Sequence, residues 1–399
     1  FKDKELLKNS NKGNTFYCDY HMDGKAHAIS PTKIKVIENS KNLIHIAYVD
    51  NRSMLGVSYH FMLKDNDTAI YSYVNAWNNH EDEFEINEFR TVYRISNELL
   101  HIGYNSERSG IQPTSEHMKE GRKIQDETYE LEDGSLYTNS NIYSKYDYAG
   151  YFKENEFWGQ YGKNYGFWFI PVNTGYYGCG PLNQDLLVHY DGIILNYMCS
   201  EHFGKGKFMI PKNWEKIYGP WCIYLNEGTN KINDVKNRVN YEKKLWPYSW
   251  VNEKNYNRKT TTVKGNITIN KNKPNNKFII VLSSGKTNSN ELIKQKDGYT
   301  FYSETNENGE FIIKDVKPDI YTAHIYSNGG DFIDTHTLSN IYIDDEHEKN
   351  IGTININAQE KRIVWQIGES TRTTEGFKFS SQLRNYIWKD LVPNNLIYT

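Results

Sequence analysis

Two arginines stand four positions apart in the segment Asn87-Glu-Phe-Arg-Thr-Val-Tyr-Arg94. This segment has the pattern of a β-strand. Residues an even number apart project from the same face of a strand. Arg90 and Arg94 are therefore expected side by side, where two planar guanidinium groups match the geometry of a carboxylate. The alternative is that both arginines pair with acidic side chains of the protein itself.

A lysine lies among aromatic residues in the segment Tyr143-Ser-Lys-Tyr-Asp-Tyr148. Most lysines are solvated surface residues, and spacing alone assigns Lys145 no chemistry. If Lys145 is buried among these rings and close to the arginines, desolvation and like charge should lower its pKa. A lysine with a lowered pKa can act as a general base near neutral pH.

A third group of polar residues follows in Gly178-Cys-Gly-Pro-Leu-Asn-Gln-Asp185 and Ile193-Ile-Leu-Asn-Tyr-Met-Cys-Ser-Glu-His-Phe-Gly204. Here Tyr197 and His202 come at the end of an apolar strand, next to a glycine-containing turn. Strand ends and adjoining loops commonly carry the functional residues of β-scaffolds. His189 lies nearby and is the rival candidate for a histidine role. A structural histidine is the alternative interpretation for both.

The elements that must position these residues are short segments with a period of two, separated by turn residues. The pattern predicts an all-β protein with large antiparallel sheets. Examples in the first half of the chain are Ile34–Ile37, Leu43–Tyr48, Val57–Phe61 and Thr91–Ile95.

The composition changes in the polar stretch 253–264, which is typical of a linker. Residues 262–358 then contain short apolar segments at the spacing of a small β-sandwich, with Asn308-Gly309 as a tight-turn signal directly before a strand. A third unit begins near Lys361 and is too short within this chain to close a core of its own.

Composition excludes several classes of protein. Lys and Arg number 47 and Asp and Glu number 50, for a net charge of −3, so no basic face suited to nucleic acid is expected. No apolar stretch is long enough for a transmembrane helix. Four cysteines are too few and too scattered for a disulfide framework or a zinc site; one disulfide or free buried thiols both stay open. Aromatic residues make up 15% of the chain, which suits half-buried sheet faces and also clefts that stack sugar rings.

Taken in order, these elements resemble the rhamnogalacturonan lyases (rhamnogalacturonan endolyases) of polysaccharide lyase family 4. Each match is weak alone, and five in register along essentially the whole chain are fairly specific. The matching elements are Glu88-Phe89-Arg90 with Arg94, Ser144-Lys145-Tyr146, Gly180-Pro181 with Asp185, Tyr197-Met198 with Ser200 and His202, and Val364-Trp-Gln-Ile-Gly368 with Gly376-Phe377.

The resemblance implies an all-β architecture of three domains. Residues 1–258 would form a large, supersandwich-like catalytic β-sandwich, and residues 262–358 a fibronectin type III-like β-sandwich. Residues 361–399 would begin a jelly roll similar to a carbohydrate-binding module. The family's catalytic domain starts before Phe1 and its jelly roll extends past Thr399, so a chain truncated at both ends is expected.

The resemblance further implies a secreted, monomeric enzyme that acts on rhamnogalacturonan I of pectin. It would cleave the rhamnose–galacturonic acid linkage by β-elimination and leave a 4,5-unsaturated galacturonate end. No cofactor, nucleic acid or membrane is expected, and no metal cluster is visible in the sequence; a peripheral calcium ion stays open.

Residue by residue, Lys145 matches the family's catalytic base and His202 its catalytic acid. Arg90 matches the substrate-binding arginine, Tyr197 an active-site tyrosine and Arg94 a second arginine of the same strand. His189 matches no catalytic position, so the resemblance favours His202 over it.

The leading alternative is a non-catalytic, pectin-binding protein of the same fold. Such a protein would have no need for both Lys145 and His202, and their joint presence favours the enzyme. A glycoside hydrolase would require two facing carboxylates, and the most acidic segment, His80-Glu-Asp-Glu-Phe-Glu85, is typical of a solvated loop. A cell-surface adhesion module is the weakest of the alternatives.

Overall fold

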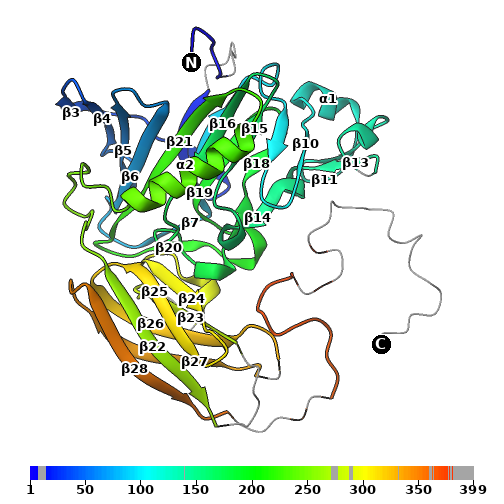
Figure 1. Cartoon of the computed structure of the whole chain (residues 1–399). Coiled ribbons are helices and arrows are strands. Elements are labelled where there is room, and N and C mark those ends of the chain that lie inside the picture. Colours follow the sequence, from blue (N-terminus) through cyan, green and yellow to red (C-terminus); the bar gives the residue numbers. More distant parts are fainter. Residues whose placement is uncertain are drawn as a thin grey trace.

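A computed structural model describes the chain over residues 1–7, 15–138, 140–270, 277–286, 291–330, 332–358, 362, 364–375, 377 and 380. β-Strands dominate, as the sequence predicts, and they form two sandwiches joined by one connection (Figure 1). We call them the N-terminal sandwich (β1–β21 with helix α2) and the C-terminal sandwich (β22–β28). Of the 39 residues of the predicted jelly roll over 361–399, 24 fall outside the described residues.

The first sheet of the N-terminal sandwich carries the residues of interest. It has five strands in the order β18-β19-β8-β1-β2, and all neighbours are antiparallel. The strands are β18 (Val188–His189), β19 (Ile193–Ser200), β8 (Glu88–Arg94), β1 (Phe16–Met22) and β2 (Lys25–Ala28).

The second sheet has nine strands in the order β10-β9-β15-β16-β21-β6-β5-β4-β3. Helix α2 (Lys231–Leu245) lies across its outer face (Figure 1) and inserts Val235 and Val239 between buried side chains of the sheet. The strands are β10 (Ser109–Ile111), β9 (Ile102–Tyr104), β15 (Trp158–Tyr161), β16 (Tyr165–Ile170), β21 (Glu215–Glu227), β6 (Ala69–Asn78), β5 (Leu55–Lys64), β4 (Leu43–Asp50) and β3 (Lys33–Asn39).

The main core lies between these two sheets. Strand β8 contributes Phe89 and Tyr93, and the facing sheet contributes Phe169 and Trp221. Burial of each such side chain stabilises the fold by about 1.5–3 kcal/mol. Because Phe89 and Tyr93 point inward, the residues between and beside them, Arg90 and Arg94, must point to the outer face.

Short elements surround the outer face of the five-stranded sheet. They carry the second half of the candidate site, including Lys145 and His202. These elements are α1 (Ser115–Glu120), β11 (Arg122–Gln125), β12 (Thr128–Glu130), β13 (Ile142–Ser144), β14 (Ala149–Tyr151), β17 (Gln184–Leu186), β7 (Phe84–Ile86), β20 (Phe208–Ile210), and the 3₁₀ turns η1 (Gly134–Leu136), η2 (Lys145–Tyr148), η3 (Phe152–Glu154), η4 (Gly180–Leu182) and η5 (His202–Gly204).

The C-terminal sandwich packs a three-stranded sheet, β25-β22-β28, against a four-stranded sheet, β24-β23-β26-β27. Its Asn308-Gly309 turn is formed as expected, with Gly309 at φ +82° directly before β25. The domain boundaries given above remain predictions. The strands are β22 (Thr261–Ile269), β23 (Phe278–Ser283), β24 (Thr300–Glu304), β25 (Glu310–Val316), β26 (Asp319–Ser327), β27 (Thr335–Ile343) and β28 (Glu348–Ile356), with the 3₁₀ turn η6 (Leu292–Lys294).

Two further expectations are addressed by the described residues. None of their helices has the length and apolar character needed to span a bilayer. All four cysteines are buried free thiols, so of the two states left open by the sequence the structure has the reduced one.

Candidate active site

Arg90 sits in the middle of a row of side chains that crosses three strands. The register pairs it with Asp19 of β1 on one side and with Tyr197 of β19 on the other. Its Nε donates to Asp19 Oδ1 over 2.9 Å and its Nη1 donates to the Tyr197 hydroxyl over 2.9 Å, while Glu88 Oε2 lies 3.1 Å from Nη1. Burial alone would lower the pKa of Arg90, but Tyr197, Asp19 and Glu88 together raise it, so the guanidinium stays charged.

Arg94 lies four residues after Arg90 on β8 and has a different environment. Its Nη2 lies 3.5 Å from the Tyr17 hydroxyl, and its guanidinium lies 5.8 Å from the centre of the Tyr17 ring. No carboxylate within the described residues forms an ion pair with it. The prediction that both arginines share one face is confirmed, but pairing with the protein's own acids applies to Arg90 and not to Arg94.

Both arginines line a cavity of about 360 Å³ on the outer face of the five-stranded sheet, which we call the arginine cavity. Four cationic side chains reach it against two carboxylates, so the cavity favours an anionic ligand. Its lining residues are Tyr17, Arg90, Val92, Arg94, Ser115, Lys119, Glu127, Lys145, Leu186, His189, Tyr190, Asp191, Ile193, Leu195 and Tyr197.

Lys145 enters the cavity from the start of η2, a turn whose first backbone groups are capped by Ser144. Its Nζ lies 2.7 Å from Asp126 Oδ2 and 5.1 Å from the centre of the Tyr146 ring. Burial acts to lower the pKa of Lys145, as the sequence suggested, but the ion pair and hydrogen bond with Asp126 outweigh it and raise the pKa. The expectation of a lowered pKa is therefore wrong.

His202 lies just beyond a β-bulge that separates Tyr197 from Cys199 on β19. Its Nδ1 is 3.0 Å from Asp185 Oδ1, its Nε2 is 3.4 Å from Glu88 Oε1, and its ring packs edge-on against the Tyr197 ring at 5.2 Å. His202 does not line the arginine cavity. Tyr197 lies between the two, because its ring touches His202 and its side chain lines the cavity with Lys145.

Asp185 holds His202 from a fully buried position on β17. It accepts hydrogen bonds from Ser200 Oγ over 2.8 Å and from Lys205 Nζ over 2.5 Å as well as facing the imidazole. Burial alone would raise the pKa of Asp185, but Lys205 and His202 lower it, so the carboxylate is ionised. An ionised Asp185 orients the imidazole with Nδ1 as a donor.

His189, the rival histidine, does line the arginine cavity. Its Nδ1 lies 3.2 Å from the carbonyl oxygen of Tyr190, which fixes Nδ1 as the protonated nitrogen. Burial, reinforced by the charges of Lys145 and Arg94, lowers the pKa of His189 to about 4. His189 is therefore a neutral imidazole beside the lysine at neutral pH.

Sequence reasoning missed the acids that set these charges. Asp19 and Asp126 pair with the predicted cations, yet nothing in their spacing indicated it, because they come from another strand and from a loop. Glu88 lies on the same strand as Arg90 and belongs to a matched element, but no role was assigned to it. Asp185 belonged to a matched element without any role being assigned to it. The described residues contain no group of three or more His, Cys, Asp or Glu side chains that could hold a metal ion.

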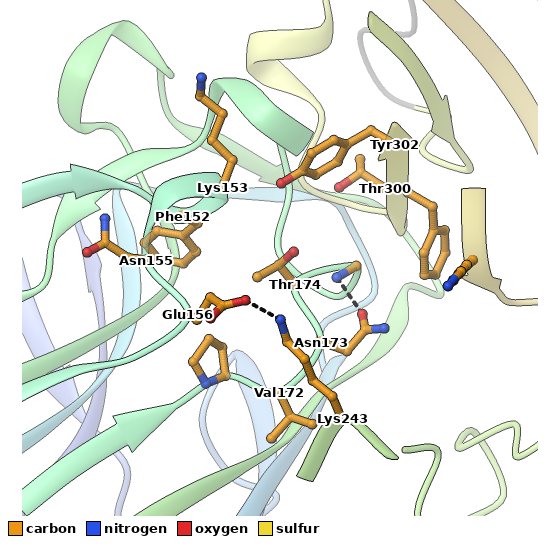
Figure 2. A pocket seen from close by; sticks show the side chains of 14 residues that line it. Phe152, Lys153, Asn155, Glu156, Val172, Asn173, Thr174, Lys243, Thr300 and Tyr302 are labelled. Atoms are coloured by element: carbon orange, nitrogen blue, oxygen red, sulfur yellow. Dashed lines mark hydrogen bonds and ion pairs between the residues drawn. The ribbon is translucent and has the colours of Figure 1, made fainter. Parts of the chain in front are cut away.

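A second cavity of about 300 Å³ lies between the two sandwiches (Figure 2). Several of its polar groups are used within the protein: Lys243 pairs with Glu156, Asn173 accepts from the Gly175 amide over 2.7 Å, and Thr300 donates to the Tyr177 carbonyl. Of these three contacts, the one between Thr300 and the Tyr177 carbonyl joins the two sandwiches, and the other two lie within the N-terminal sandwich.

Comparison with known proteins adds independent information. No family model matches the sequence. A rhamnogalacturonate lyase of Dickeya dadantii is 33% identical over 394 residues, covering 98% of this chain and 65% of the relative. Rhamnogalacturonate lyase B of Emericella nidulans is 26% identical over 305 residues, covering 68% of this chain and 45% of the relative. This chain thus spans about two thirds of the length of the first relative and under half of the length of the second.

Similarity to solved structures is weaker. A polysaccharide lyase aligns over 82% of this chain and 40% of its own, with 6% identity and a TM-score of 0.29. An α-mannosidase from Enterococcus faecalis aligns over 59% of this chain and 27% of its own, with 11% identity and a TM-score of 0.31. These scores are too low to support an argument. By its sequence, however, the chain is similar to the Dickeya dadantii rhamnogalacturonate lyase along nearly its whole length and to the Emericella nidulans enzyme along about two thirds of it.

Proposed function

We propose that this chain carries the active site of a rhamnogalacturonan lyase, which cleaves the rhamnose–galacturonic acid linkage of rhamnogalacturonan I. The observation that carries the proposal is the arginine cavity, where an amine, a tyrosine and a guanidinium with no ion-pair partner among the described residues meet beside an aspartate-held histidine. Homology to proteins named rhamnogalacturonate lyases selects the substrate class. An extracellular location and a monomeric state are part of the same proposal.

The reaction is a β-elimination on the galacturonate unit. The uronate carboxylate makes the neighbouring C5–H bond acidic, so a base can remove that proton. The electron pair then forms the C4–C5 double bond, and the C4–O bond to the departing sugar breaks as its oxygen gains a proton. The site must supply a cation for the carboxylate, a base for C5–H and an acid for the leaving oxygen.

Arg94 is the side chain best suited to bind the uronate, because no carboxylate among the described residues already pairs with it. A guanidinium there would stabilise the charge that develops on the carboxylate as the proton leaves. Arg90 would act beside it by donating to the Tyr197 hydroxyl, which fixes the tyrosine against the sugar.

Lys145 would take the C5 proton once it is neutral. The ion pair with Asp126 favours the ammonium form of Lys145, but Asp126 is the exposed partner, with 62% of its side chain accessible. An exposed ion pair is weak and exchanges readily with water, so Lys145 can leave Asp126 and release a proton to water before it accepts the C5 proton.

His202, as an imidazolium whose Nδ1–H stays bonded to Asp185, would donate its Nε2 proton to the departing oxygen. Asp185 keeps the imidazole oriented, and ring contact with Tyr197 places it next to the sugar-binding side of the site. A well-placed acid or base contributes about 10²–10⁴-fold to a rate, which sets the loss expected when either group is removed.

The test is incubation of the chain with rhamnogalacturonan I and, separately, with homogalacturonan, following the ultraviolet absorbance of the unsaturated uronate. We expect product from the first polymer and not from the second, and none from Lys145→Ala or His202→Ala variants with unchanged circular dichroism. Binding of the polymer without any product would instead indicate the non-catalytic pectin-binding protein. Near-normal turnover by either variant would refute its assigned role.

A further inference from the structure

Three buried lysines lie close to His202 at the junction of the two sandwiches. Lys205, Lys216 and Lys296 are each at most 2% exposed. Lys205 and Lys216 belong to the N-terminal sandwich, whereas Lys296 belongs to segment 295–298 of the C-terminal sandwich, between η6 and β24. An ammonium removed from water requires hydrogen-bond acceptors in its place, and the position of those acceptors shows what each lysine holds.

Lys296 holds the loop that directly follows the catalytic histidine. Its Nζ donates to the carbonyl oxygens of Lys205 over 2.7 Å, of Gly206 over 2.7 Å and of Lys207 over 3.3 Å. A lysine ammonium has three donors, and all three are used on this one loop. The loop begins immediately after η5, whose first residue is His202.

The loop is linked back to the imidazole through Lys205. The Lys205 amide donates to the His202 carbonyl over 3.2 Å, and Lys205 Nζ donates to Asp185 Oδ2 over 2.5 Å. Asp185 in turn holds His202 Nδ1. The carbonyl that accepts from Lys296 therefore belongs to the residue that anchors the partner of the histidine.

Segment 295–298 is itself fixed by the N-terminal sandwich, so Lys296 is not a free arm. Lys216 Nζ donates to the carbonyl oxygens of Lys296 over 2.8 Å and of Gly298 over 2.5 Å. The Cys179 amide donates to the Gln295 carbonyl over 2.7 Å, and Trp214 Nε1 donates to the Asp297 carbonyl over 2.9 Å. The segment and the loop after His202 are thus held in register.

We propose that Lys296 is a positioning residue of the active site, which fixes the His202 imidazole by way of the 205–207 loop, Lys205 and Asp185. The proposal rests on the proposed function for the role of His202. It gives the C-terminal sandwich a part in catalysis although Lys296 does not line the arginine cavity.

The experiment compares Lys296→Met, which keeps the length of the stem and removes the donors, with Lys296→Arg, which restores donors on a longer side chain. We expect kcat of Lys296→Met to fall by about tenfold or more, a fraction of the contribution of a placed acid, with KM nearly unchanged because the cavity is intact. Lys296→Arg should recover part of kcat. The matched control is Lys294→Met, two residues away, where the lysine is 40% exposed and pairs with Glu291.

A purely structural role would lower the unfolding temperature without changing the environment of His202. The ¹⁵N resonances of its imidazole, assigned with His202→Ala, separate the two roles: they should shift in Lys296→Met and not in Lys294→Met. Unchanged imidazole resonances together with unchanged kcat overturn the proposal. If Lys296→Met does not fold, Lys296→Arg is judged by the same two readouts. If the wild-type chain makes no unsaturated product, the proposed function fails, and the imidazole spectra alone decide whether Lys296 positions His202.

Discussion

The two arginines of the arginine cavity differ in whether acidic side chains of the protein already pair with them. Arg90 contacts Asp19, Glu88 and Tyr197, whereas Arg94 contacts only Tyr17 among the side chains described above. The two arginines therefore have different roles, although they lie on the same face of one strand. One guanidinium holds the site together, and the other can receive a ligand.

This difference predicts opposite phenotypes for the two arginines. Arg94→Gln should reduce kcat/KM about 100-fold, or roughly 2.7 kcal/mol of transition-state stabilisation, with an unfolding temperature close to wild type. Arg90→Gln leaves Asp19 and Glu88 without their cation and should destabilise the fold by about 3–5 kcal/mol. Kinetics and denaturant unfolding of both variants check this. Equal stability losses in the two would contradict it.

The pH dependence of the reaction should follow the proton on Lys145. Asp126 raises the pKa of Lys145, and the base works only when neutral, so kcat/KM should increase as pH rises through the alkaline range. Asp126→Asn removes the raising influence and leaves the lowering effect of burial. The increase in activity should then occur at lower pH, with more activity than wild type near neutrality.

A pH–rate profile of Asp126→Asn measures this shift directly. Asp345→Asn is a suitable control because it also removes an exposed aspartate from an ion pair with a lysine, Lys259, far along the chain in the C-terminal sandwich. A profile displaced to higher pH in Asp126→Asn would show that Lys145 is not the titrating base.

For the strands, the sequence indicates which residues of one strand share a face. It does not indicate which residues of neighbouring strands they contact. The strand pattern of 87–94 correctly placed Arg90 and Arg94 on one face, and Ile34–Ile37 and Leu43–Tyr48 fall within β3 and β4. The counter-ions Asp19 and Asp126 depend on strand register and loop position, which no local pattern encodes. For that reason the pKa of Lys145 was predicted with the wrong sign.

Helix α2 was missed for a different physical reason. Its buried residues are Lys231, Val235, Val239 and Glu242, which recur at helical spacing, yet two of the four are charged. Glu242 is buried because Arg238, Tyr71 and Tyr248 hydrogen-bond to it. A hydrophobic periodicity cannot register a helix whose inner face is partly ionic.

The position of α2 on the outside of the nine-stranded sheet predicts a stability effect without a kinetic one. Val239→Ala should lower the free energy of unfolding by about 1–3 kcal/mol through the cavity it leaves, while kcat stays at the wild-type value. Lys236→Ala, on the exposed side of the same helix, should change stability by less than about 0.5 kcal/mol. Chemical denaturation of both variants tests the assignment, and a kcat loss in Val239→Ala would show that the helix is coupled to the site.

In the whole molecule, the two sandwiches have separate main hydrophobic cores, and their junction contains buried hydrogen bonds from lysines. Composition and strand spacing predict the small sandwich, and the large sandwich before it is implied by the family resemblance. The hydrogen bonds of the junction could not be predicted in this way. Their acceptors are backbone carbonyls that accept from Lys216 and Lys296, and lysines carry no sequence signal for burial.

The arginine cavity is cationic in a chain whose formal net charge is −3. Attraction of a polyanion to such a site is local, and it should weaken as dissolved ions screen it over a Debye length of about 8 Å at physiological ionic strength. We therefore expect KM for the polymer to rise several-fold between about 0.05 M and 0.5 M sodium chloride while kcat changes little; a salt-independent KM would contradict this. Methyl esterification of the galacturonate carboxyls would remove this charge altogether. The degree of esterification of the polymer, and not only its sugar sequence, would then determine where this chain could bind.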